Sequence, residues 1–138
     1  MTTFPTPKAI KTTLLASLIA CTLACGYSSK TNPPPTAGNI PAIAQLAPAS
    51  TTAGAAGFTL TVNGSKFNTN AVVNWNNASQ TTSYVGSGQL TVAIPASAIA
   101  TSGTVHVTVT NPGTPGTGMY GSGGTMSETS NGMIFTIN

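Results

Sequence analysis

From residue 43 onward, apolar and polar residues alternate along short segments that Gly, Pro, Asn and Ser separate. A period of two with many β-branched residues is typical of strands that bury one face. The pattern is weak at residues 80–85, which Gly86 and Gly88 bound, so we expect an edge strand there. We predict strands at residues 43–47, 58–63, 71–75, 80–85, 90–94, 104–110 and 133–137, and one helical turn at 96–100 after Pro95.

Seven short strands within about 95 residues have the spacing of a β-sandwich. The chain is therefore predicted to be all-β, with Trp75 in the core. Strand parity places His106, between two valines, on the solvent face. Taking alternate positions inward predicts a core of Phe58, Leu60, Val62, Phe67, Val73, Trp75, Leu90, Val92, Ile94, Val105, Val107, Val109, Phe135 and Ile137.

The N-terminus carries a separate signal. Lys8 and Lys11 precede an apolar run at residues 12–20, which Cys21 follows directly. A positive segment, a short apolar segment and small residues are typical of a secretory signal peptide. The run is too short to span a bilayer, which needs about 20 apolar residues. The sequence Leu-Ile-Ala before Cys21 resembles the lipobox of bacterial lipoproteins, which implies cleavage before the cysteine and lipidation of its thiol.

A second cysteine leaves the lipidation site open. Cys21 has leucine and alanine at the −3 and −1 positions, whereas Cys25 has threonine at −3 but is followed by Gly26. We favour Cys21, with Cys25 as the alternative. The predicted organisation is a signal peptide at 1–20, a lipid-anchored Pro/Ser-rich tether at 21–40 and one domain at 41–138. We expect an exported protein held in the cell envelope, at the periplasmic face or the cell surface.

Charge is unusually scarce, since only 4% of the residues are charged. Lys8 and Lys11 leave with the signal peptide, so the mature chain sets Lys30 and Lys66 against Glu128. This near-neutral balance argues against nucleic acid as a partner, because nucleic-acid-binding surfaces are basic. Solubility then depends on Thr, Ser, Asn and Gly.

Motifs at the strand ends make a further pattern: Pro41-x-Ile43, Leu46-x-Pro48, Ala53-Gly54, Gly64-Ser65-Lys66-Phe67 after the strand at 58–63, Val73-x-Trp75-Asn76, Ile94-Pro95, Asn111-Pro112 and Phe135-Thr136-Ile137. Over residues 41–138 this pattern resembles the IPT/TIG family, which includes plexins, some transcription factors and many bacterial surface proteins. The resemblance implies an immunoglobulin-like sandwich of the early-set type, acting as a binding or spacer module. We expect Gly64 to take the positive φ of a turn or bulge. Residues 113–130 depart from the family pattern as an insertion.

No constellation of catalytic or metal-binding residues is predicted. A Ser triad needs a base and an acid, and His106 and Glu128 are the only candidates in the domain, with nothing in their spacing to recommend them. Metal binding by His106 lacks partner residues. Residues 116–121 read G-x-G-x-x-G, but a strand rather than a helix follows, so we expect a flexible loop and not a nucleotide site. The chain is predicted not to be an enzyme and to use no cofactor.

Two aromatic residues at expected surface positions are the candidate ligand contacts; the alternative is that both rings lie against neighbouring side chains. Tyr84 lies on the predicted edge strand and Tyr120 in the Gly-rich loop, where aromatic side chains can contact proteins or glycans. The main hypothesis is a lipid-anchored envelope module that binds or presents proteins. The alternatives are carbohydrate binding through Tyr84 and Tyr120, and a purely structural spacer.

Overall fold

The computed structural model describes residues 33–117 and 123–138. The predicted signal peptide, both cysteines and Tyr120 lie outside these residues. Among the helices of the described part, none has the length and apolar character needed to cross a membrane.

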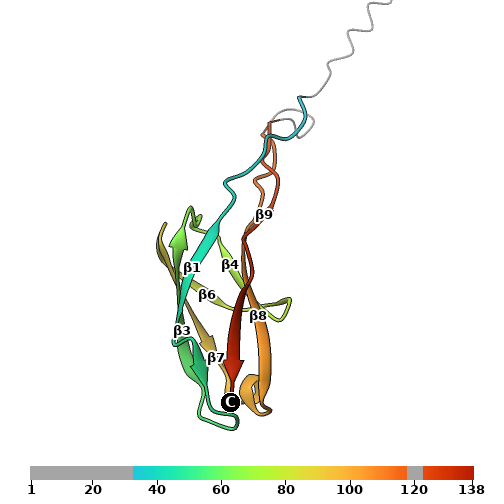
Figure 1. Cartoon of the computed structure of the whole chain (residues 1–138). Helices are drawn as coiled ribbons and strands as arrows, with labels where there is room; N and C mark the ends of the chain where they lie inside the picture. The colour runs from blue at the N-terminus through green and yellow to red at the C-terminus, as the bar shows by residue number, and fades with distance from the viewer. Residues whose placement is uncertain (1–32, 118–122) are drawn as a thin grey trace, which may run out of the picture. The chain divides into compact units, whose positions relative to one another are not determined.

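The described chain forms two β-sheets (Figure 1). The first sheet contains, in spatial order, β1 (Ala42–Ala47), β3 (Phe58–Ser65), β7 (Gln89–Ile94) and β6 (Thr82–Gly86). The second contains β2 (Ser50–Thr51), β10 (Met133–Ile137), β8 (Gly103–Asn111), β4 (Val72–Trp75) and β5 (Ala78–Ser79), and β9 (Glu128–Thr129) pairs with β8. Neighbouring strands are antiparallel except β2 and β10. The prediction of an immunoglobulin-like β-sandwich is confirmed.

The strands of four or more residues are the ones that alternation predicted, and their ends agree within two residues. The strand β6 lies at a sheet edge, as expected, and the helical turn is a short 3-10 helix at Ala96–Ile99. The two-residue strands β2, β5 and β9 were not predicted, because two residues are too few to show a period.

The predicted core lies between the two sheets. All of its members are buried except Phe58, which is half-buried. Phe135 lies at the centre of an aromatic cluster: its ring centroid is 5.6 Å from that of Phe58 and 5.0 Å from that of Trp75. These three side chains come from β3, β4 and β10, so the cluster joins the first sheet to the second. The core also includes Ile43, Leu46, Ala71 and Ile99.

The expected role of Gly64 was wrong. Strand β3 continues through Gly64 to Ser65, and the left-handed residue is Lys66, with φ of 59°. A Cβ atom on Gly64 would collide with the carbonyl oxygen of Ala42 and the ring of Phe67. Glycine is therefore needed at this position for the close approach of β1 and Phe67, and not for its backbone angle.

A buried asparagine fixes the loop that follows β3. Asn111 is 1% exposed, and its Oδ1 accepts a hydrogen bond from the backbone N–H of Asn68 at 3.0 Å. Its Nδ2 donates to the carbonyl oxygens of Asn39 and Lys66, each at 2.7 Å. Within the described residues, no buried side-chain nitrogen or oxygen lacks a hydrogen-bond partner. Asn111 thus joins β8 to the β3–β4 loop and to the segment before β1.

The insertion at 113–130 is described on both sides of residues 118–122, and most of the loop at 116–121 that we expect to be flexible lies outside the described residues. Its two described flanks pair with each other, since the Thr125 N–H donates to the Thr114 carbonyl oxygen at 3.0 Å and the two threonine hydroxyls lie 2.9 Å apart. Strand β9 then pairs with the end of β8. The described part of the insertion is therefore tied to the sandwich by backbone hydrogen bonds.

The segment before β1 runs beside these flanks (Figure 1). Thr36 donates its N–H to Gly124 and accepts from Met126, both at 3.0 Å. The Gly38 N–H donates to Oε1 of Glu128 at 3.2 Å. We call residues 36–38 together with 123–128 the N-terminal arm. In Figure 1 it lies at the end of the domain opposite the C-terminus.

Candidate functional site

The two titratable residues considered for catalysis have structural surroundings. His106 is exposed on β8, as predicted, and pairs across the sheet with Ile134. Glu128 is half-buried, and its carboxylate accepts a hydrogen bond from the backbone N–H of Gly38. The described residues contain no group of three or more His, Cys, Asp or Glu side chains that could hold a metal ion. Neither residue therefore contributes to a recognisable catalytic set.

The larger cavity opens where the first sheet loses a strand. Strand β7 pairs with β3 along its whole length, but its pairing with β6 ends at Thr82↔Val92. Before Thr82 the chain crosses to the other sheet, where the Gln80 N–H donates to the Val73 carbonyl oxygen at 2.9 Å. This crossing leaves the last residues of β7 without a strand on one side.

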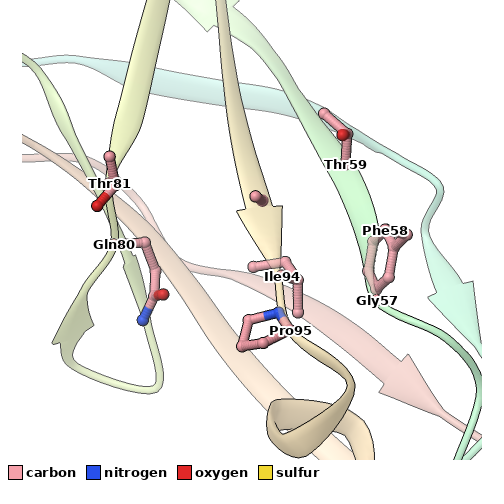
Figure 2. Close-up of a pocket in the computed structure, with 8 residues that line it drawn as sticks. Gly57, Phe58, Thr59, Gln80, Thr81, Ile94 and Pro95 are labelled. Carbon is pink, nitrogen blue, oxygen red and sulfur yellow. The ribbon is translucent and has the colours of Figure 1, made fainter.

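The resulting cavity has a volume of about 710 Å³. We call it the switch groove, because the chain changes from one sheet to the other beside it. Residues 57–59, 80–81 and 93–95 line it. Figure 2 shows Gln80 and Thr81 on one side, Ile94 and Pro95 at the end of β7, and Phe58 on β3. Phe58 is half-buried, whereas Thr59 and Thr81 are exposed. The groove therefore combines an apolar floor with a polar rim, the composition that ligand and hot-spot pockets share.

The backbone adds hydrogen-bonding groups to the switch groove. The carbonyl oxygen of Ile94 faces β3, 2.9 Å from where a Cβ atom on Gly57 would lie. Successive residues of an antiparallel strand direct their N–H and C=O groups to opposite sides. The N–H and C=O of Ala93 therefore point away from β3, to the side on which Thr81 lies, where the pairing of β6 with β7 ends.

A second cavity, of about 340 Å³, has the predicted contact residue Tyr84 in its lining. We call it the Tyr84 cavity; residues 67–70, Tyr84 and residues 112–114 line it. Tyr84 is 39% exposed and comes from β6, whereas the other residues come from the β3–β4 loop and the segment after β8. The structure thus brings three separate parts of the chain together at Tyr84.

Sequence reasoning proposed Tyr84 as a candidate contact but predicted neither cavity. The switch groove forms because β7 extends beyond the end of its pairing with β6. The only signal of this in the sequence was the weak alternation at residues 80–85, compared with the clear alternation at 90–94. Asn68, Thr69 and Asn70 read as ordinary turn residues, and their position beside Tyr84 follows from the fold alone. The second predicted contact, Tyr120, lies outside the described residues.

A family model described as IPT/TIG domain matches residues 41–128 of the chain. No curated protein and no solved structure matches the chain.

Proposed function

Because the chain belongs to the IPT/TIG domain family, we propose that it is a lipid-anchored binding and presentation module of the cell envelope that contacts a partner protein through the switch groove. Domains of this kind are immunoglobulin-like and generally non-catalytic. The observation that carries the proposal is the open stretch of β7 beside an apolar floor.

The backbone of the groove suits an extended segment of a partner. A strand or loop that continues the line of β6 can donate a hydrogen bond to the C=O of Ala93 beside the end of β7, as in recognition by strand addition. Pairing of this kind needs no charged residue. It therefore fits a domain whose described residues include only Lys66 and Glu128 as Lys or acidic residues.

The floor of the groove suits a large apolar side chain. Phe58 is half-buried against Phe135, and the exposed Pro95 forms the adjoining wall. Interfaces draw most of their binding free energy from a few apolar or aromatic side chains that fill such pockets. A partner with an aromatic or aliphatic residue in an extended loop is the kind that the groove would accept.

Photo-crosslinking in the native cells tests the proposed partner. A photo-reactive amino acid at Thr81, inside the groove, is expected to give a discrete adduct with another protein. The matched control is Thr104, an exposed threonine on the outer face of the second sheet, which should give no such adduct. Equal labelling at Thr81 and Thr104, with normal localisation of the protein, would favour the spacer alternative and contradict the proposal.

The proposed anchor is a lipid on Cys21, with Cys25 as the alternative, after removal of the signal peptide at 1–20. The support is the Leu-Ile-Ala-Cys sequence behind a positive and apolar leader. Stable attachment requires more than one acyl chain, because a single chain binds membranes only marginally. We therefore expect several acyl chains on the processed protein.

Intact mass measurement of the protein from the membrane fraction tests the anchor. We expect the mass of a chain that begins at the modified cysteine, increased by its acyl chains. Cys21→Ser should abolish this increase and release the protein from membranes, whereas Cys25→Ser should leave both unchanged; the reverse result would assign Cys25. A cleaved chain without added mass would contradict lipid anchoring and indicate a secreted protein.

A further inference from the structure

We propose that the Tyr84 cavity is a binding site for neutral carbohydrate, separate from the switch groove, with which it shares no lining residue. The proposal rests on an exposed aromatic ring beside three polar side chains in a cavity of about 340 Å³. It does not depend on the protein-binding function proposed above.

The polar side chains of the cavity are available to a ligand. Asn68 is half-buried, and Thr69 and Asn70 are exposed. Among the hydrogen bonds of residues 33–117 and 123–138, none uses the side chain of Asn68, Thr69 or Asn70. Two amides and a hydroxyl can together donate and accept, which is what the hydroxyl groups of a sugar require.

The loop that carries these side chains is held in place before any ligand binds. Its backbone is fixed at Phe67, whose N–H donates to the Ser87 carbonyl oxygen at 3.0 Å, and at Asn68, whose N–H donates to the buried Asn111. The Ala71 N–H closes the turn on the Asn68 carbonyl oxygen at 2.9 Å. A site formed in advance avoids the entropic cost of ordering a loop on binding.

The composition of the cavity indicates the class of ligand. No residue that lines it carries a charge, so nothing in it selects for a phosphate, a carboxylate or an ammonium group. The exposed ring of Tyr84 offers an apolar face with a polar hydroxyl at its edge. A sugar ring has the matching surface, because its C–H groups form an apolar face and its hydroxyls surround the edge.

The test uses the full-length protein in detergent, titrated calorimetrically with cellohexaose, maltohexaose, xylohexaose and mannohexaose. We expect at least one of these neutral oligosaccharides to bind. Tyr84→Ala should weaken that binding about tenfold or more, the loss typical of an aromatic hot spot, whereas Tyr84→Phe should retain most of it. Asn70→Ala should weaken binding less than Tyr84→Ala does.

Controls separate this site from the switch groove. Ile134→Ala removes another exposed apolar side chain, on the second sheet, and should leave oligosaccharide binding unchanged. Tyr84→Ala should leave the crosslink at Thr81 unchanged, so that failure of one proposal is distinguishable from failure of the other. Absence of binding to all four oligosaccharides, or binding that Tyr84→Ala does not weaken, would overturn the carbohydrate proposal.

Discussion

Replacing Phe135 by alanine is expected to lower the free energy of unfolding by about 3–5 kcal/mol, the usual cost of truncating a fully buried phenylalanine. Phe135 is 0% exposed and contacts aromatic rings from both sheets. Its removal leaves a cavity between Phe58 and Trp75 that neither ring can fill without leaving its own position. Because β10 also pairs with β8, the strand itself should remain in place.

Urea unfolding followed by fluorescence gives the measurement, since Trp75 is the only tryptophan in the chain. Ile134 is the matched control, because it directly precedes Phe135 on β10 but is 49% exposed. Ile134→Ala should change the free energy of unfolding by less than about 1 kcal/mol. Similar losses for the two variants would mean that Phe135 does not hold the two sheets together.

The second large effect is expected at Asn111. Asn111→Ala leaves the carbonyl oxygens of Asn39 and Lys66 and the N–H of Asn68 without their present partner. A buried polar group that loses its partner costs about 1–3 kcal/mol. We therefore expect the free energy of unfolding to fall by about 3 kcal/mol, measured by the same urea titration.

Asn111→Asp separates the loss of hydrogen bonds from the loss of volume. The carboxylate keeps the size of the side chain and still accepts from Asn68, but it faces two carbonyl oxygens that the amide approaches to 2.7 Å. A buried carboxylate that faces two carbonyl oxygens, with one N–H as its donor, is more costly than an unpaired neutral group, so at neutral pH the loss should at least equal that of Asn111→Ala. The control Asn70→Ala, at an exposed asparagine, should cost about 0.5 kcal/mol or less. A stable Asn111→Asp variant would contradict the proposed role of Asn111 as a donor.

Much of the sandwich was predictable because one buried face imposes a period of two on each strand. This pattern located β3, β7 and β8 and placed Trp75, Phe135 and their neighbours in the core. It also placed Tyr84 on an edge strand with its side chain accessible. These features were readable because each depends on residues close together in the sequence.

The features that sequence reasoning missed depend on contacts between distant residues. Asn111 forms hydrogen bonds with Asn68, Lys66 and Asn39, which are separated from it by 43, 45 and 72 positions in the sequence. The presence of an asparagine at position 111 does not by itself reveal such distant partners. The requirement for glycine at position 64 comes from Ala42 on a neighbouring strand and from the folded-back ring of Phe67. The switch groove follows from the relative lengths of β6 and β7. The register between strands and the close approach of distant segments leave no periodic pattern in the sequence. The alternation of apolar and polar residues therefore cannot predict them.

The N-terminal arm also determines how the domain would respond to mechanical force. Residues 36–38 run parallel to residues 123–128, the second flank of the insertion, as the Thr36↔Thr125 bridge shows. Tension applied along the chain before Thr36 would therefore shear the arm. Three hydrogen bonds lie across this direction and would resist together: Thr36 N–H to Gly124, Met126 N–H to Thr36, and Gly38 N–H to Glu128. An arm loaded in shear protects β1 from being peeled off β3 one hydrogen bond at a time.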